Sequence, residues 1–594
     1  MKKNNKIFVF IFGILIGLTL TAVVGLSFLK FYRHFKSPKR YNTSNILAKL
    51  HGPTIQNDVK IFTASSLDRI FLDGKTLEKP AFSTQAMIRA ARNEYESFQV
   101  VVFPLKKDLH NVQIKSSELL ESKTKKVLSS DSITWRKVDY VPTGDPYYPV
   151  KYIGLWPDPL IPVQTADVQA GQYQPFWLTV YIPEDTAAGV YDGVITVSAD
   201  GTTAQSIPIS LNVYDFTLPQ ESHLKTAFDF YGHITKLRYP QGEKESEAAW
   251  AARIGEINEK FIIEMLKYRM NPILNIDPTV PAELGSIDRY RKYGINNFSI
   301  GRRGGTFNNN WPTDEESINN FTGLYRTYAE LLKLNGMLDF TYIYSWDEGE
   351  IGNPVVNRVT GMIRRAHSGL KNMVCYHGFW DPVKDPEWGK YIDIWTFNAD
   401  DFKEPAMRAL QKLGIEMWMY ISGPSGLGAP NLAMDFSSID YRIIPWLCWK
   451  YDIKGFLYWC VNWWEKADPF QSAVNTKWEQ NGNGLLFYPG EDGPLASIRT
   501  EIFRDGMEDY EYIQILIKKI KELKILKLDS RYLKEIQECI RSMTIDPTIA
   551  ESMASFTKDG EILKQRRNLI ADKIEKITRL IAEASAAAQT QIQP

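Results

Sequence analysis

The sequence predicts an α/β fold class: a (β/α)8 TIM-like barrel preceded by an all-β sandwich, with an apolar N-terminal segment and a helical C-terminal tail. Two observations support this prediction. Between about residues 60 and 215, apolar side chains alternate with period two, which is typical of antiparallel strands with one buried face. After residue 219, short apolar runs alternate with longer stretches of helical period, which is typical of βα units around a parallel sheet.

The chain of 594 residues divides into four predicted segments. Residues 1–40 form a membrane anchor or signal segment, 55–217 the β-sandwich, 220–525 the barrel with a C-terminal extension, and 526–594 the helical tail. In the sandwich, Asp200-Gly201 separates two alternating runs, residues 194–198 and 207–213, as the turn of a hairpin would. In the tail, residues 561–582 have the pattern of an amphipathic helix, which we expect to pack on the barrel or on a partner.

The N-terminal segment contains a run, residues 7–29, without any charged side chain, and this run is long enough to cross about 30 Å of hydrocarbon. A cleaved signal peptide is the alternative, but the run is long for one and no clear cleavage site follows it. The flank after the run is the more basic one, which taken alone would place the large domains in the cytoplasm. Large domains translocate largely regardless of such charges, so we expect a membrane-anchored protein with an extracellular catalytic domain, or a secreted one if the segment is cleaved.

Eight short apolar runs predict the strands of the barrel. They span about 240 residues, which is near the usual size of this fold, and stretches of helical period lie between several of them, at residues 243–269, 319–334 and 436–451. In a (β/α)8 barrel the active site lies at the C-terminal ends of the strands, so the residues that follow each run are the candidates for function. The runs are residues 224–230, 271–276, 296–300, 338–346, 371–376, 391–397, 415–420 and 455–460.

Charge and metal-ligand patterns exclude several classes of function. Seventy lysine and arginine residues balance seventy acidic ones, so no global positive field favours nucleic acid. The four cysteines form no C-x-x-C pair, and the seven histidines show no close metal-ligand spacing, so we expect no metal and no other cofactor. The run from Gly301 to Gly305 lacks the spacing of a P-loop and is better interpreted as a βα loop, from which an arginine has a small chance of contacting substrate.

Two adjacent acids, Asp347 and Glu348, follow the fourth run directly. Neighbouring side chains on a regular strand point to opposite faces, so both enter one pocket only if the backbone turns, which Gly349 would permit. Two carboxylates held together raise the pKa of one of them, and the resulting acid and base suit glycoside cleavage. The alternative is that both acids are solvated loop residues or helix caps.

Tryptophan is concentrated in the same half of the chain, where eleven of the sixteen lie between Trp346 and Trp478. Aromatic faces stack on the C–H faces of sugar rings, and nearby polar groups bind hydroxyls, so these residues favour a carbohydrate cleft. A single tryptophan is still more often a core residue, and Trp446 and Trp449, at helical spacing, are interpreted in that way. The predicted substrate-binding residues at run ends are His377, Trp395, Asn398, Tyr420, Trp459, Asn462 and Trp463.

Three C-terminal motifs together carry a resemblance to a known family. The segment GFLYWCVNWW at 455–464 is followed by NGLLFYPG at 483–490 and by RDGMEDYE at 504–511. This combination resembles the catalytic domain of glycoside hydrolase family 123, and the segment ARNEYESFQV at 91–100 resembles the sandwich that precedes it. The resemblance implies a retaining β-N-acetylgalactosaminidase acting on a glycan or glycolipid, with the substrate's own acetamido group as nucleophile.

The adjacent acidic pair of that family matches Asp347 and Glu348. The resemblance implies that Glu348 protonates the departing oxygen and later activates water, while Asp347 orients the acetamido N–H and stabilises an oxazolinium-like intermediate. Substrate assistance of this kind is a recognised exception to the two-carboxylate scheme. Many relatives have proline after the pair, where this chain has Gly349.

Two other functions remain open at this stage. One is a glycosidase of different sugar specificity, in which Glu348 is the acid and Glu465 or Asp468 is its partner. The other is a non-catalytic surface protein that binds carbohydrate through the tryptophans and does not need the acidic pair.

Overall fold

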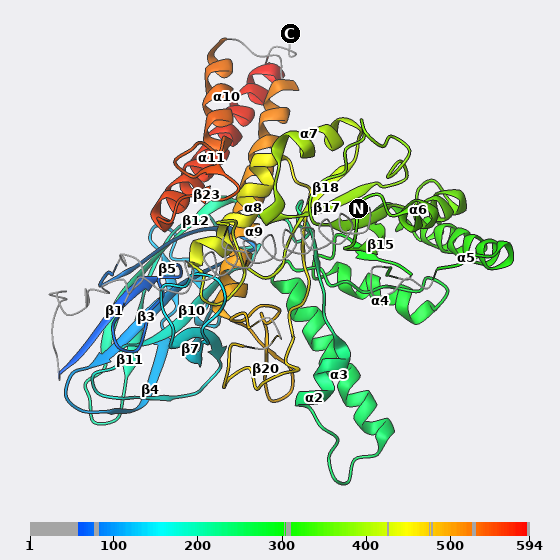
Figure 1. Ribbon diagram of the computed structural model, residues 1–594. Helices are drawn as coiled ribbons and strands as arrows, with labels where there is room; N and C mark the ends of the chain where they lie inside the picture. Colours follow the sequence, from blue (N-terminus) through cyan, green and yellow to red (C-terminus); the bar gives the residue numbers. More distant parts are fainter. Residues whose placement is uncertain are drawn as a thin grey trace, which may run out of the picture.

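The computed structural model describes residues 58–75, 82–301, 303–304, 311–424, 427–474, 476, 479–525 and 530–590. Figure 1 shows a β domain in blue to cyan, a barrel-like domain in green to yellow, and C-terminal helices in orange to red. The predicted membrane segment, residues 7–29, lies outside the described residues. Within those ranges, no helix has both the length and the apolar character that crossing a bilayer requires.

The predicted β-sandwich is present as two facing sheets. One sheet has the strand order β1-β3-β10-β7-β8, and the other has the path β2-β12-β11-β4-β9, with β5 and β6 attached through β11. The strands are β1 (Val59–Ser65), β2 (Ala86–Arg92), β3 (Glu94–Pro104), β4 (Leu109–Ser116), β5 (Leu119–Glu121), β6 (Val127–Leu128), β7 (Ile133–Pro142), β8 (Leu155–Ile161), β9 (Ala166–Val168), β10 (Gln174–Ile182), β11 (Gly189–Ser198) and β12 (Gln205–Thr217).

The hairpin predicted around Asp200-Gly201 joins β11 to β12, which pair antiparallel, and Gly201 has a φ of 66°. The predicted antiparallel pairing fails at one place, because β2 pairs parallel with β12. At Asn93, whose φ is 56°, the chain passes directly from β2 to β3 in the opposite sheet. The next strand, β3, therefore lies in the other sheet, and β2 pairs with β12, which is distant in sequence.

Strand β10 is buried on both faces. Phe176, Leu178 and Val180 point into the core between the two sheets, whereas Trp177 points the other way, into the core shared with the barrel. The five-stranded sheet therefore serves two cores, one inside the sandwich and one between the domains.

Seven parallel strands form the barrel-like domain, in the order β13-β19-β18-β17-β16-β15-β14. Their C-terminal ends meet at one rim, as the sequence predicts. The strands are β13 (Lys225–Phe228), β14 (Phe298–Ser299), β15 (Thr341–Asp347), β16 (Asn372–Tyr376), β17 (Ile394–Asn398), β18 (Glu416–Ile421) and β19 (Gly455–Tyr458).

The second predicted run, residues 271–276, is not a strand. It closes the ring through two isolated parallel bridges, Phe228 with Pro272 and Ile276 with Ile300. Pro272 has no N–H to donate, and Asn275 has a φ of 51°, so a regular ladder cannot form along this run. The eightfold prediction therefore holds for seven runs, and the eighth position is filled by irregular backbone.

Helices cover the outside of this ring, with one departure from the regular alternation: residues 377–393, between β16 and β17, contain turns but no helix. Short two-stranded ribbons lie in the C-terminal half, namely β20 (Tyr488–Pro489) with β21 (Pro494–Leu495) and β22 (Ala550–Ser552) with β23 (Ser555–Phe556). The helices are α2 (Gly232–Arg238), α3 (Glu247–Lys267), α4 (Pro281–Arg291), α5 (Glu315–Leu334), α6 (Pro354–Ala366), α7 (Glu404–Lys412), α8 (Ser438–Tyr451), α9 (Ile498–Ile525), α10 (Ser530–Met543) and α11 (Gly560–Thr590).

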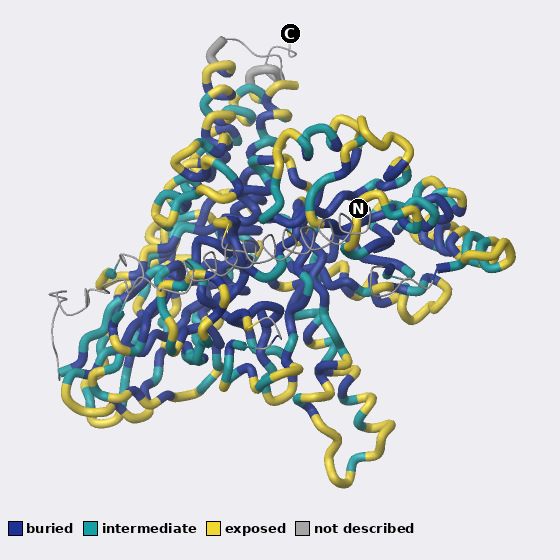
Figure 2. Tube along the Cα trace, viewed as in Figure 1, coloured by how far each residue is buried: buried dark blue, intermediate teal, exposed yellow. Residues whose placement is uncertain are grey.

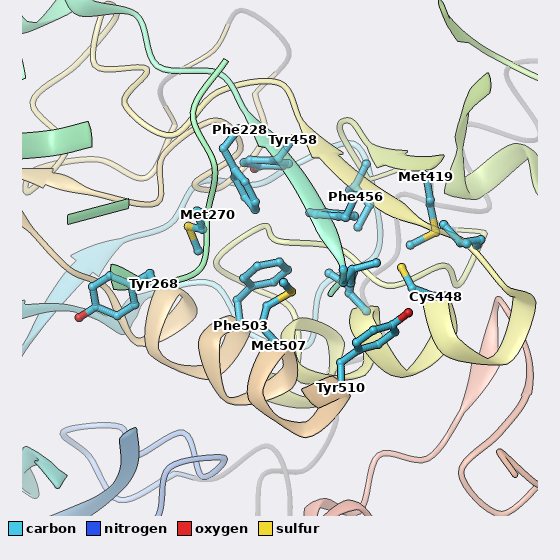
Figure 3. Close-up of a cluster of buried hydrophobic side chains, with 14 of the residues drawn as sticks. Phe228, Tyr268, Met270, Met419, Cys448, Phe456, Tyr458, Phe503, Met507 and Tyr510 are labelled. Atoms are coloured by element: carbon cyan, nitrogen blue, oxygen red, sulfur yellow. The ribbon is translucent and has the colours of Figure 1, made fainter. Parts of the chain in front are cut away.

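Helix α9 lies where the three parts meet, and Figure 2 shows this central region as the most deeply buried part of the molecule. Phe503 of α9 packs against Phe228 and Phe456 of the barrel, with ring centroids 5.4 and 5.5 Å away. Figure 3 shows Phe503 and Met507 directed at these strands. The tail helix α11 packs on α9 and on the sandwich, where Arg567 pairs with Glu94 of β3.

Fully buried ion pairs connect α9 to both domains. Arg499 forms a two-pronged pair with Asp158 of β8, at 2.9 and 2.8 Å, and Arg442 of α8 forms another with Asp509, at 2.7 and 2.9 Å. All four side chains are inaccessible to solvent. Removing one partner from such a pair leaves an uncompensated buried charge.

We predict that Asp158→Asn destabilises the protein by about 3–5 kcal/mol, because Arg499 then keeps its charge without a counter-ion. The midpoint of urea unfolding, followed by circular dichroism, measures the loss. Asp492→Asn is the control, since its pair with Lys260 is exposed and should matter little. Equal midpoints for the two variants would contradict a special role for the buried pair.

Candidate active site

The two adjacent acids lie together at the C-terminal end of β15. Glu348 itself has a φ of 55° and Gly349 a φ of 111°, so the backbone turns at the pair and not only after it. Both carboxylates lie near Cys375 and Tyr420, and their charges contribute to raising the pKa of each of these two side chains, for which burial is the larger cause. The strand is also irregular just before them, because its register against β16 shifts between Tyr344 and Trp346.

Asp347 is held from the β14 side of the ring. Arg303 donates to its Oδ2 at 2.6 Å, and Tyr344 donates to its Oδ1 at 2.7 Å. The register shift explains how Tyr344 and Asp347, three residues apart, share one face of the strand. Arg303 also pairs with Asp229 beyond the end of β13, and its guanidinium lies 4.4 Å from the centre of the Tyr344 ring. Burial raises the pKa of Asp229.

Glu348 is held from the opposite side. Tyr420 of β18 donates to Oε1 at 3.2 Å, and His377 Nε2 lies 3.4 Å from the same oxygen. The other imidazole nitrogen, Nδ1, lies 2.8 Å from Asp401. The His377 contact lowers the pKa of Glu348, and the two carboxylates raise the pKa of His377 to about 9, with Glu348 the larger cause.

This arrangement differs from the predicted electrostatics of the pair. The sequence predicts that the neighbouring carboxylates raise the pKa of one of them. Instead the pKa of Glu348 is lowered, because the imidazole stabilises its charged form and Arg303 lies beside Asp347. The expectation is therefore wrong for Glu348 in this arrangement.

Five of the seven predicted binding residues form two groups at or just beyond the C-terminal ends of the strands. His377, Tyr420 and Asn398 lie around Glu348, and buried Asn398 donates to Ser422 at 2.9 Å. Trp459 and Trp463 form a pair after β19, with ring centroids 5.4 Å apart.

Two predicted substrate contacts are not supported by their placement. Trp395 is fully buried and stacks on Tyr376, 5.2 Å away, in the layer outside the strands. Its neighbour Ile394 takes the position facing the barrel interior, so alternation turns Trp395 away from the mouth. Asn462 is fully buried and uses both amide atoms, each at 3.0 Å, on the backbone of Tyr231.

The site also contains four residues that were not among the predicted site residues: Asp229, Arg303, Tyr344 and Asp401. Asp229 sits at the end of the first run and Asp401 four residues after the sixth, so position alone marked both as candidates. The contact of Tyr344 with Asp347 depends on a register shift that no sequence pattern indicated. The sequence predicts at most a substrate contact for an arginine of this loop, whereas in the structure Arg303 joins two carboxylates, those of Asp229 and Asp347.

Across the part of the chain that the structure describes, no three His, Cys, Asp or Glu side chains are arranged to hold a metal ion. The polar groups at the mouth are paired with one another through carboxylate, imidazole and guanidinium contacts.

Two family models match the chain. The glycoside hydrolase 123 catalytic domain matches residues 303–516, and the glycoside hydrolase 123 N-terminal domain matches residues 67–199. The chain belongs to glycoside hydrolase family 123. The resemblance of the sandwich and of the barrel to family 123 is therefore confirmed.

One solved structure of a family 123 protein has the same fold. A family 123 glycoside hydrolase from Clostridium perfringens, from a study of glycolipid glycan hydrolysis, has 15% identity and a TM-score of 0.65, covering 89% of this chain and 100% of that one. A family 39 glycoside hydrolase from Bacteroides cellulosilyticus WH2 has 11% identity and a TM-score of 0.32, covering 71% and 82%. A GH5 xyloglucanase from Bacteroides ovatus has 9% identity and a TM-score of 0.27, covering 71% and 98%. The last two scores are too low to carry an argument. No curated protein sequence matches the chain.

We predict that His377 titrates with a pKa of about 9. Because this pKa is raised, the imidazolium stabilises the fold below the ordinary histidine pKa of about 6.5, and that contribution disappears as the pH rises through 9. Glu348→Gln should lower the pKa of His377, since its largest cause is removed. NMR titration of 15N-labelled histidine rings measures this, with His377→Gln to assign the signal.

The matched control for this titration is Glu350→Gln, which neutralises an exposed carboxylate two residues further along. It should leave the His377 titration in place. An unchanged His377 pKa in Glu348→Gln would show that the contact between the two side chains does not form in solution.

Proposed function

We propose that this family 123 protein is a retaining glycoside hydrolase that removes terminal β-linked N-acetylhexosamine, with N-acetylgalactosamine favoured, by substrate-assisted catalysis. The observation that carries the proposal is the placement of Asp347 and Glu348: they are neighbours at the C-terminal end of one strand, and each is held by its own partners. A conventional retaining enzyme needs its two carboxyl groups about 5–5.5 Å apart across the scissile bond. Adjacent residues on one side of a sugar ring do not fit that requirement.

Asp347 suits the task of orienting an acetamido group. Arg303 and Tyr344 fix both oxygens of the carboxylate. A carboxylate held in this way accepts the acetamido N–H and stabilises positive charge as the carbonyl oxygen attacks the anomeric carbon. The acetamido group thereby supplies the attacking atom that the protein does not place on the other face of the ring.

Glu348 suits proton transfer to the leaving oxygen, with His377 as its proton store. The Glu348–His377 pair holds one transferable proton, which the raised pKa of the imidazole retains up to about pH 9. When the departing oxygen approaches Glu348, that proton passes from Nε2 to the carboxylate and on to the leaving group, while Asp401 keeps the Nδ1 proton of His377 in place. Water then loses a proton to Glu348 as it opens the oxazolinium intermediate.

The substrate class rests on two supports. The resemblance of the acidic pair implies an N-acetyl sugar, and the Clostridium perfringens relative was studied for hydrolysis of glycolipid glycans. Trp459 and Trp463, paired after β19, offer aromatic surface for a sugar ring. We therefore propose a glycan or glycolipid carrying a terminal N-acetylhexosamine.

A glycosidase with a conventional carboxylate pair is the second candidate. It would need Glu465 or Asp468, both exposed on the connection after β19, to act opposite Glu348. A surface protein that only binds carbohydrate is the third, but it would not need Asp347 and Glu348 each to be held by two polar side chains.

We predict that Glu348→Gln lowers kcat/KM on a natural glycan by roughly 10²–10⁴-fold, because general acid catalysis is lost. The loss should be smaller for substrates with very good leaving groups, which need less protonation. Steady-state kinetics on both kinds of substrate measure the difference. Wild-type turnover of the natural glycan by this variant would remove Glu348 from the mechanism.

We also predict a strict requirement for the 2-acetamido group. A substrate with a free 2-hydroxyl should be inert, Asp347→Asn should slow formation of the oxazolinium, and a thiazoline mimic of that intermediate should inhibit strongly. Rates on matched 2-acetamido and 2-hydroxy glycosides measure the first effect. Efficient cleavage of a plain β-galactoside, or a trapped covalent glycosyl ester, would favour the conventional alternative.

For localisation we propose a membrane-anchored protein with an extracellular catalytic domain, supported by the uncharged run at residues 7–29. The anchor and the activity should separate, so a chain beginning near residue 45 should be soluble and active. Fractionation of both forms tests this. Full-length protein with an intact N-terminus in the soluble fraction would contradict the proposal.

A further inference from the structure

A loop of the sandwich, residues 143–154 between β7 and β8, lies against the barrel. Gly144 donates to Asn481 Oδ1 at 2.8 Å and accepts from its Nδ2 at 3.1 Å. Buried Tyr148 donates to the Asp435 carboxylate at 3.1 Å and accepts from the Asn481 backbone N–H at 3.1 Å. These contacts fix the loop to the barrel.

Tyr147 is the residue of this loop that presents a large ring to solvent next to these contacts. Its side chain is 50% exposed, although its neighbour Tyr148 is buried. The hydroxyl of Tyr147 accepts a hydrogen bond from Gln480 at 2.6 Å, and the ring packs edge-on against Tyr148 with centroids 5.4 Å apart. The ring is thus held in place while half of its surface stays open.

The contacts of Gln480 locate this ring over the end of β18. A Cβ atom added to Gly423, two residues after β18, would lie 1.6 Å from Gln480 Nε2, so the amide rests directly on that backbone. Gln480 also accepts from Asn483, which in turn accepts from Trp459 at 2.8 Å. Burial is the larger cause that raises the pKa of the Tyr147 phenol, and the charge of the Asp400 carboxylate, just beyond the end of β17, raises it further.

These neighbours place Tyr147 on the Glu348 side of the mouth. Glu348 is held by Tyr420 of β18 and by His377, whose partner Asp401 follows Asp400. Asp347 is held from the other side, by Arg303 near β14. A general acid must face the leaving-group oxygen, so the leaving group departs on the side where Tyr147 lies.

We propose that Tyr147, contributed by the β-sandwich, forms the binding surface for the leaving-group sugar that follows the cleaved N-acetylhexosamine. This inference rests on the proposed function. The open phenol ring matches the apolar C–H face of a hexose, and the carboxylates of Asp400 and Asp401 accept hydrogen bonds from its hydroxyls. The sandwich thereby contributes to substrate selection in the barrel.

The test compares two substrates in the full chain: a disaccharide with N-acetylhexosamine β-linked to a hexose, and the matching N-acetylhexosaminyl fluoride, which has no leaving-group ring. Tyr147→Ala should lower kcat/KM for the disaccharide roughly five- to tenfold more than for the fluoride, the size of one aromatic contact. Tyr147→Phe should retain most of the preference. Ile153→Ala, an exposed apolar residue of the same loop, is the matched control and should not change the ratio.

The outcomes separate this inference from the proposed function. If the wild type hydrolyses neither substrate, the proposed function fails. If the wild type hydrolyses both and Tyr147→Ala lowers both rates equally or leaves both unchanged, Tyr147 is not part of the leaving-group site. Binding of the disaccharide to the Glu348→Gln protein gives a second measurement, and its dissociation constant should rise when Tyr147→Ala is added.

Discussion

A row of buried carboxylates on α9 is the constraint on which the rest of the structure depends. The helix buries Glu501, Asp505, Glu508, Asp509 and Glu511. A buried charge without a partner costs several kcal/mol, so cations must come from whatever packs around the helix. Arg136 of β7 pairs with Glu501, and Arg442 of α8 pairs with Asp509. Asp509 also meets Arg567 of α11, so the sandwich, the barrel layer and the tail are all drawn to one helix.

Close packing accompanies these charges. A Cβ atom added to Gly506 would lie 2.6 Å from the Arg442 carbonyl oxygen, so only glycine allows α8 and α9 to approach this closely. The motif at residues 504–511, which contributed to the family resemblance, therefore contains a glycine that this helix packing requires. Burial raises the pKa of Asp505 and Glu508, because loss of water outweighs their arginine neighbours.

The first turn of the same helix contacts a segment that borders the candidate active site. Arg499 binds Asp158 of the sandwich and donates to the carbonyls of Leu432 and Gly482, each at 2.8 Å. Gly482 lies between Asn481, which fixes the sandwich loop, and Asn483, which fixes Trp459. Arg499 thus helps to hold residues 481–483 in place. These residues contact both the sandwich loop that contains Tyr147 and Trp459 at the end of β19.

Periodicity and position predicted the sandwich, seven of the barrel strands and the placement of Asp347 and Glu348 at a strand end. These features depend on local alternation and on the general rule for barrel active sites, and both are visible in a sequence. What a sequence does not show is which neighbour a side chain meets. The imidazole between Glu348 and Asp401, the arginine between Asp229 and Asp347, and the outward direction of Trp395 all depend on register and on contacts between segments far apart in the chain.

The turn at the acidic pair shows how one backbone choice defines the site. The backbone of Glu348 lies in the left-handed region, which costs a residue with a side chain about 1 kcal/mol. Its N–H donates to the Cys375 carbonyl at 2.9 Å. Gly349 then takes a φ of 111°, which proline cannot adopt because its ring fixes φ near about −65°. The segment after the pair therefore follows a path that is closed to relatives with proline at this position. The left-handed backbone at Glu348 and the positive φ of Gly349 together set the direction in which the chain leaves the acidic pair.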